Sequence, residues 1–416
     1  MLRKILFVWV LAPTILLGQK KLTLSDQSYE WQIKTVQLYP YLGGPRDYVQ
    51  PAVVPLEQQN LVLEFDDLQD QRNYYYVKLI HCNFDWSRSQ LTDLDFFDGY
   101  NENPIQEYHF SNTLHTRYVH YRFVVPPVKL PGNYLLIAYR NGEQDDLVLS
   151  KRMMVFANQV AINRDTQLAG AGTLQLGKQI LNFDVDYSGM QLINPADNVH
   201  VVMRQNFRWD NAKFNLSPNY INEASSRLEY RFFDATNQFD AGNEFRWADF
   251  RSLQAPGANT VRINRLVKPY ELYLAVDAPR TDQFYAQYPD LNGTYIIENL
   301  DIGEGLLTGE YVYTNFVLKM PQTTDPIYLV GAFNYYQRTE ENRMNYNPGG
   351  FFESRQLIKQ GLYNYQYVTE SKTGTNGLEG NHFETENVYE VLVYQRPFRP
   401  NADLLVGYYL VTMNAR

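Results

Sequence analysis

The runs YYYVKLIHC (74–82), RYVHYRFVV (117–125) and YLLIAY (134–139) decide the fold of this chain. Each run is short, rich in aromatic and β-branched residues, and separated from the next by segments rich in Asn, Asp, Pro and Gly. This composition between turn-forming residues is typical of β-strands. The stretch 74–139 therefore predicts a β-sheet domain.

The run 117–125 shows the pattern most clearly. Val119, Tyr121 and Phe123 recur at every second position, and His120 and Arg122 lie between them. A period of two places the apolar side chains on one face of a strand and the polar ones on the other. We therefore expect this strand to pack one face into a core.

Similar runs extend over the rest of the chain and predict an all-β fold class: three tandem β-sandwich domains, the first and third immunoglobulin-like, with few or no long helices. About seven short strands and an Asn141-Gly142 hairpin signal lie between residues 31 and 157. The segment PQTTDP (321–326) indicates a linker. The expected domains are residues 19–158, 159–321 and 322–416, the last being immunoglobulin-like or E-set-type.

The first 18 residues predict a secretory signal peptide. Arg3 and Lys4 precede the apolar run 5–17, and the small residue Gly18 follows it. The run is short for a transmembrane helix, although a membrane anchor is the alternative. We therefore expect the chain to be exported.

Charge and cysteine content limit the partners. The chain has 37 basic and 46 acidic residues among 416, a net charge of −9, which argues against nucleic acid as a partner. Cys82 is the only cysteine, so no internal disulfide can form. We expect a buried, inert thiol, with a reactive or partner-linking thiol as the alternative.

Sequence motifs for catalysis or metal binding are absent. The chain has no His-Glu-x-x-His, paired-cysteine or Walker motif. Four histidines, His81, His109, His115 and His120, lie close in sequence, but His120 alternates with apolar residues and is expected to pair across strands. We predict no catalytic residue, no metal and no cofactor.

The polar cluster HCNFDWSRS (81–89) is the most unusual segment. Asp85 and Ser87 could brace a loop around Trp86 through Asx-type hydrogen bonds. The alternative is a contact surface for a partner. We favour the bracing role.

The same cluster resembles the first domain of the type IX secretion plug family of Bacteroidetes. The similarity includes the segments FDDL (65–68), YYYVKLIHCNFDWSRSQL (74–91), FFDGY (96–100), FSNT (110–113), PGNYLL (131–136) and KRMMVF (151–156). It continues through FRWADFRSL (245–253), GEYVYTNFVL (309–318), IKQGLYNYQYV (358–368) and FETENVYEVLVYQRP (383–397). It therefore extends over nearly the whole chain after the signal peptide.

The resemblance implies a periplasmic, non-enzymatic subunit that binds the periplasmic mouth of the large outer-membrane β-barrel translocon and closes its pore. It implies no small-molecule substrate, and attachment to the outer membrane only through the barrel, without direct insertion. The motif residues are then structural or partner-contacting: His81, Asn83, Asp85, Trp86, Ser89, Asn112, Tyr118 and Tyr121.

Two alternatives remain. Residues 330–336 and 361–368 also resemble glycogen-binding-type modules, so Tyr335 and Tyr336 could stack on sugar in an exported carbohydrate-binding protein. Such modules use tryptophan, and no tryptophan follows Trp247. A secreted hydrolase with an unrecognised carboxylate pair is the third hypothesis.

Overall fold

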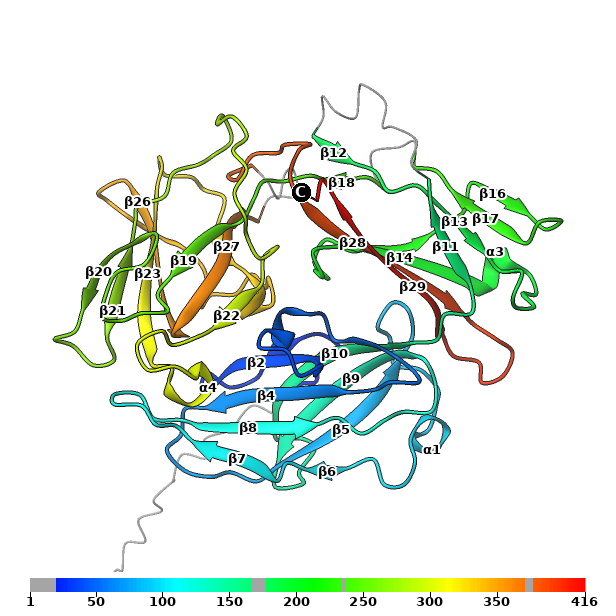
Figure 1. Cartoon of the computed structure of the whole chain (residues 1–416), viewed down its shortest axis with the longest axis horizontal. Coiled ribbons are helices and arrows are strands. Elements are labelled where there is room, and N and C mark those ends of the chain that lie inside the picture. Colours follow the sequence, from blue (N-terminus) through cyan, green and yellow to red (C-terminus); the bar gives the residue numbers. More distant parts are fainter. Residues whose placement is uncertain (1–19, 166–176, 233–236, 371–376, 416) are drawn as a thin grey trace, which may run out of the picture.

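The computed structural model describes residues 20–165, 177–232, 237–370 and 377–415, so the predicted signal peptide lies outside it. Three β-sandwiches are grouped around a common centre (Figure 1). We call them the first sandwich (27–156), the second sandwich (161–240 with 387–413) and the third sandwich (246–369). The predicted all-β class without long helices is confirmed.

The first sandwich consists of a six-stranded and a four-stranded sheet. The first contains β1 (Gln27–Ser28), β10 (Leu147–Phe156), β9 (Gly132–Arg140), β5 (Tyr75–Cys82) and β6 (Asn103–Pro104) in that order, with β3 (Val53–Pro55) on β10. The second contains β2 (Ile33–Pro40), β4 (Leu61–Asp67), β8 (Val119–Val124) and β7 (Glu107–Phe110). Two short helical segments, η1 (Asp47–Val49) and α1 (Asp93–Phe96), lie in its loops.

The strands of this sandwich follow the sequence pattern. Leu63, Phe65 and Tyr121 point into the core and are at most 1% exposed. At the predicted Asn141-Gly142 turn both residues have positive φ, 55° and 78°, as a turn between antiparallel strands requires. Burying each large apolar side chain contributes about 1.5–3 kcal/mol.

The second sandwich combines segments from both halves of the chain. One sheet contains β11 (Ala161–Arg164), β13 (Phe183–Asp186), β17 (Arg227–Tyr230) and β16 (Tyr220–Asn222). The other contains β15 (Lys213–Leu216), β14 (Val199–Gln205), β28 (Asn387–Gln395) and β29 (Leu404–Met413). A ribbon of β12 (Lys178–Gln179) and β18 (Phe239–Asp240) and the helix α3 (Pro195–Asn198) complete it.

In the sequence, the third sandwich (246–369) lies between the two segments that form the second sandwich. One sheet contains β19 (Arg246–Asp249), β27 (Gly361–Thr369), β22 (Tyr295–Ile297) and β24 (Ile327–Val330). The other contains β20 (Thr260–Asn264), β21 (Glu271–Leu274), β23 (Tyr311–Lys319), β26 (Phe351–Lys359) and β25 (Asn345–Asn347). The short helices are α4 (Gly305–Thr308) and η3 (Ala332–Asn334).

These sheets do not follow the predicted division into 159–321 and 322–416. β28 pairs with β14 from Val199 to Gln205, and the red strands β28 and β29 lie beside green β14 in Figure 1. Val391 and Val393 are buried in the core of the second sandwich. The C-terminal strands therefore complete the second sandwich, and the third is an insertion rather than the end of a tandem row. Alternation identifies a strand but not its partner, which is why the sequence did not reveal this arrangement.

Candidate functional site: the seams between the sandwiches

The predicted cluster at 81–89 forms a braced turn at the end of β5. The Asn83 amide donates to the Ser87 carbonyl at 2.8 Å, and Asp85 Oδ1 accepts from the Ser87 amide at 2.9 Å and from its hydroxyl. Trp86 has φ 68°, a conformation that bulky residues rarely adopt. The Asx-type bonds suggested by the sequence are present and hold this conformation.

The turn packs its aromatic side chains against the second sandwich. The Trp86 ring is 2% exposed and meets Trp209 edge-on at 5.0 Å, with the Arg152 guanidinium 4.5 Å above it. Phe84 stacks on His200 at 4.2 Å. These contacts form the seam between the first and second sandwiches.

Hydrogen bonds tie the same turn to the C-terminal part of the second sandwich. The Phe84 amide donates to Asp403 Oδ2 at 3.0 Å. Asn133 Nδ2 donates to the Asn83 carbonyl at 3.0 Å, and Asn133 Oδ1 accepts from the Tyr394 hydroxyl at 2.8 Å. The seam is therefore polar as well as aromatic, which fixes its geometry.

His81 is buried beneath this turn. Its ring meets Tyr134 edge-on at 5.0 Å, and its carbonyl accepts from the Ser89 amide at 3.1 Å. Burial lowers the pKa of His81 to about 4, so the imidazole is neutral at physiological pH. A Cβ on Gly132 would lie 2.5 Å from His81 Nε2, so this position requires glycine. His81 is therefore a buried packing residue at the start of the 81–89 turn.

Tyr118 anchors the first sandwich to the third. Its hydroxyl donates to the carbonyls of Leu306 at 2.9 Å and Gly309 at 3.1 Å, on either side of the end of α4. Lys359 Nζ lies 4.2 Å from the centre of its ring. Tyr118 is 1% exposed and is therefore an internal contact.

The loop before Tyr118 adds a second connection to the third sandwich. The Asn112 amide donates to the Leu307 carbonyl at 2.7 Å. The Glu310 carboxylate accepts from three successive amides, Leu114 at 2.5 Å and His115 and Thr116 at 3.2 Å each. A carboxylate in such a nest of amides is held in one position.

A buried charge cluster crosses the seam between the first and third sandwiches. Asp66 accepts from His120 Nδ1 at 2.8 Å, from the Tyr311 hydroxyl at 2.7 Å and from Lys359 Nζ at 2.7 Å. Burial alone would raise the pKa of Asp66, but Lys359 and His120 outweigh it and lower the pKa. The cluster is an ionic contact between segments almost 300 residues apart.

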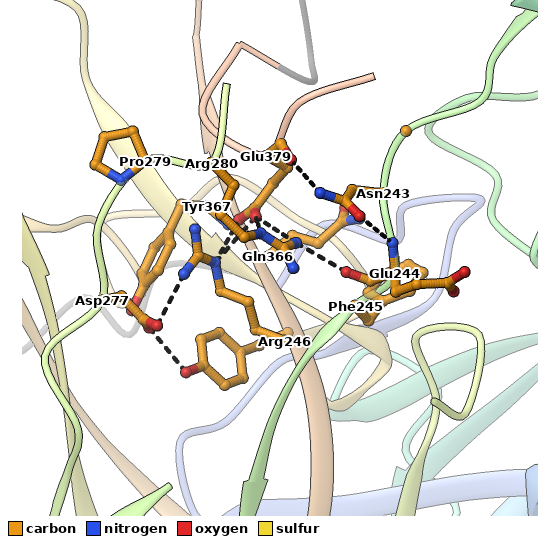
Figure 2. A network of polar contacts seen from close by, with 12 residues as sticks. Asn243, Glu244, Phe245, Arg246, Asp277, Pro279, Arg280, Gln366, Tyr367 and Glu379 are labelled. Atoms are coloured by element: carbon orange, nitrogen blue, oxygen red, sulfur yellow. Dashed lines mark hydrogen bonds and ion pairs between the residues drawn. The ribbon is translucent and has the colours of Figure 1, made fainter. Parts of the chain in front are cut away.

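Two chain segments connect the second and third sandwiches, and Figure 2 shows the polar network between them. Glu379 is 1% exposed and accepts from Arg246 Nε at 2.9 Å and from Arg280 at 2.6 Å, while Arg246 also reaches Asp277 at 2.8 Å. Burial would raise the pKa of Glu379, but the two guanidinium groups lower it. Asn243 Nδ2 donates to the Glu379 carbonyl at 2.9 Å, so the two connections are bonded to each other.

The comparisons with known proteins identify the first sandwich. Residues 33–157 match the family described as the type 9 secretion system plug protein first domain. The first sandwich therefore belongs to the family of plug first domains. The match confirms the resemblance over the first domain, residues 33–157.

The chain also matches a solved structure over most of its length. The crystal structure of a hypothetical protein from Parabacteroides merdae is 25% identical, with a TM-score of 0.88 over 94% of this chain and 100% of that chain. A second structure, titled as manganese lipoxygenase of Gaeumannomyces graminis with part of zonadhesin of Komagataella pastoris, is 7% identical over 92% and 94% of the chains. Its TM-score of 0.15 indicates no shared fold. No functionally curated protein matches the chain.

The predicted motif residues of the plug domain fall into two groups. Most of them brace or form the two seams: His81, Asn83, Asp85, Trp86, Ser89, Asn112 and Tyr118. Tyr121 instead belongs to the core, where it stacks on Phe65 at 5.1 Å and meets Tyr75 edge-on at 4.9 Å. None of the buried members offers a free surface to an outside partner.

Sequence reasoning missed Asp66 and Lys359. A signal was present, because the apolar run 61–67 contains the carboxylates Glu64, Asp66 and Asp67, which need partners if they are buried. His120 was expected to pair across strands, and it does so with Asp66 on β4. Cys82 is a free, buried thiol, as expected.

Tyr335 and Tyr336, the residues of the carbohydrate alternative, are packed against other sandwiches. The Tyr336 hydroxyl donates to the Gly293 carbonyl at 2.9 Å, and Arg208 lies 4.2 Å above the ring. Lys151 lies 4.6 Å from the Tyr335 ring. Both rings therefore already have partners from other sandwiches and present no open platform for a sugar.

Within the described residues no cluster of three or more His, Cys, Asp and Glu side chains has the arrangement of a metal site. None of the helices described is both long and apolar enough to cross a bilayer. The distinctive chemistry of the chain lies in its buried seams, which can hold three sandwiches in a fixed arrangement.

Proposed function

We propose that the chain is a non-catalytic, periplasmic plug subunit, which binds the periplasmic mouth of the type IX secretion translocon in the outer membrane and occludes its pore. The observation that carries this proposal is the match of residues 33–157 to the plug first domain. The predicted signal peptide supports export to the periplasm.

The seams support the proposed mechanism. An obstacle in a wide pore must keep its shape, and the Asp66–Lys359, Trp86–Trp209 and Arg246–Glu379 contacts hold the three sandwiches together. Buried ion pairs resist separation, because breaking one leaves an uncompensated charge. The chain would therefore act as one rigid body and need no cofactor.

A candidate contact surface for the translocon lies where loops of the first and third sandwiches meet, at the lower left of Figure 1. Leu266 is 94% exposed, Leu114 84% and Ile302 70%. Lys268 Nζ lies 2.6 Å from His115 Nε2, which brings the Leu114 and Leu266 loops together. Exposed apolar groups gathered in one region favour protein contact.

The test is recovery of the outer-membrane barrel. A tagged chain captured from detergent extracts of the outer membrane should bring down the large translocon barrel, identified by mass spectrometry, and adding the chain to that barrel in a planar bilayer should lower its conductance. Recovery of soluble proteins alone, or unchanged conductance, would contradict the proposal.

Variants locate the surface. The triple variant Leu114→Ser, Leu266→Ser, Ile302→Ser should lose most of the captured barrel. The control variant Phe284→Ser, Phe398→Ser changes side chains that are 97% and 90% exposed on other loops, and it should retain capture. Equal capture by both variants would show that the barrel binds elsewhere.

A further inference from the structure

A cavity of about 400 Å³ lies where the three sandwiches meet. The first sandwich contributes residues of β2, β10 and the segment 48–52, the second contributes 207–210, and the third contributes η3 with the residues after it. Binding sites for small molecules are often found at domain interfaces and have volumes of roughly 300–1,000 Å³. Neither the plug family match nor the seams assign a role to this cavity.

One wall of the cavity is cationic. Arg204 and Arg208 line it, and each is already paired. Arg204 contacts Glu390 through two nitrogens, and Arg208 binds Asp210 at 3.0 and 2.6 Å. These two guanidinium groups have carboxylate partners and are not available to neutralise a ligand.

Arg152 on the same wall differs. Its Nε and a terminal nitrogen donate to the Leu24 carbonyl at 3.0 and 2.5 Å, and its guanidinium lies 4.5 Å from the Trp86 ring and 5.2 Å from the Trp209 ring. Among the ion pairs of the described residues none includes Arg152. Burial lowers its pKa to about 10, although the charge of the nearby Asp26 opposes the shift.

The remaining walls combine apolar and aromatic side chains with polar ones, among them Asp26 and Gln37. Met153 and Leu38 line the cavity from the first sandwich, and Tyr295 and Tyr335 line it from the third. Lys151, a further cation of the lining, is 3.4 Å from Asp26 and lies over the Tyr335 ring. Asp26 also lines the cavity, but its ion pair is with Lys151. Arg152 is therefore the lining cation that has no carboxylate partner among the ion pairs of the described residues.

We propose that this cavity binds a small organic carboxylate with an apolar, aromatic-sized body. The carboxylate would contact Arg152, and the body would lie among the apolar side chains of the first and third sandwiches. A single guanidinium without an ion-pair partner suits a monovalent carboxylate better than a phosphate, which carries more charge and needs more donors. The proposal is independent of the plug function.

The experiment uses 4-fluorophenylacetate as the probe and the full chain as the receptor. Fluorine NMR should detect binding of this acid, and the neutral 4-fluorophenylacetamide should bind at least about tenfold more weakly, because it cannot form the charge-assisted bond. Inorganic phosphate should not compete. Failure of the acid to bind, or equal binding of acid and amide, would overturn the proposal, and displacement by phosphate would replace the carboxylate class with a general anion site.

Two variants and a control assign the site. Arg152→Gln should weaken binding at least about tenfold, because it removes a charged hydrogen-bond donor. Ala52→Leu fills the cavity from the first sandwich without changing its charge, and should also lose binding, so it provides the test if Arg152→Gln does not fold. The control Arg262→Gln, an exposed position on β20, should bind normally. Unchanged binding in Ala52→Leu would show that the probe lies elsewhere.

Discussion

Lys359 Nζ lies 2.7 Å from Asp66 Oδ2, with both side chains at most 1% exposed, and this pair joins the third sandwich to the first. Such a pair is costly to form, because both charges must be desolvated. Removing one of the two charges costs more, because the other is then buried without a partner. Lys359 shows this balance, because its burial lowers its pKa although Asp66 opposes the shift.

Asp66→Asn should therefore lower the free energy of unfolding by about 3–5 kcal/mol, because it leaves the Lys359 ammonium buried without a carboxylate. Urea unfolding followed by circular dichroism measures this change. The double variant Asp66→Asn, Lys359→Met should be more stable than Asp66→Asn alone. Asp70→Asn is the control, because Asp70 and Arg117 form an exposed pair at 3.2 Å, and such pairs contribute about 1 kcal/mol or less. Equal losses in Asp66→Asn and Asp70→Asn would refute the role of the seam.

His120 should make stability depend on pH above neutrality. Burial would lower its pKa, but hydrogen bonds to Asp66 and Glu64 outweigh burial and raise it from 6.5 to about 8. A raised pKa stabilises the folded state below pH 6.5, and this contribution is lost as the pH rises through 8. Between pH 6.5 and 8, the free energy of unfolding of the wild type should fall by on the order of 2 kcal/mol relative to that of His120→Gln.

The control for this titration is His81, whose effect has the opposite sign. Its pKa is lowered from 6.5 to about 4, so its contribution is present above pH 6.5 and is lost as the pH falls towards 4. Unfolding free energies of His81→Phe should therefore differ in pH dependence from the wild type only below pH 6.5. A His120→Gln profile parallel to that of the wild type between pH 6.5 and 8 would contradict the assignment.

The strands could be predicted from the alternation of apolar and polar residues, but the burial of the polar face of β4 could not. Leu63 and Phe65 mark the core face of β4 in the sequence, and they are buried as expected. Glu64 and Asp66 on the other face are also buried. Glu64 pairs with Tyr39 and Arg122 of the first sandwich, whereas Asp66 is covered by Lys359 of the third. Alternation identifies residues that share a face and contains no information about a segment almost 300 residues away.

The candidate site was predictable to a similar extent. The bracing of Trp86 by Asp85 and Ser87 follows from local hydrogen-bond chemistry and was expected. Its partner Trp209 lies in another sandwich, and no local rule connects the two rings. The pairing of β28 with β14 escaped prediction for the same reason, since it depends on tertiary contacts.

Trp86→Ala should be one of the most destabilising single changes. It removes a large side chain from between Trp209 and the first sandwich, and comparable truncations cost about 3–5 kcal/mol. Trp31→Ala is the matched control, because Trp31 is 66% exposed and its loss should change the unfolding free energy by about 0.5 kcal/mol or less. Circular dichroism is the appropriate probe, since both changes alter tryptophan fluorescence. Similar stability of the two variants would mean that the seam does not depend on Trp86.

Cys82 should be unreactive in the folded chain. Its thiol is 0% exposed, and burial raises its pKa to about 12. At pH 8 an exposed thiol with a pKa near 8.5 has roughly a quarter of its molecules ionised, so ionisation alone should slow Cys82 on the order of a thousandfold. Ellman's reagent should detect almost no thiol in the native protein and one equivalent in concentrated urea. Ser225→Cys, at an exposed position of the second sandwich, should add one rapidly reacting native thiol. Rapid native labelling of Cys82 would instead favour the reactive or partner-linking role.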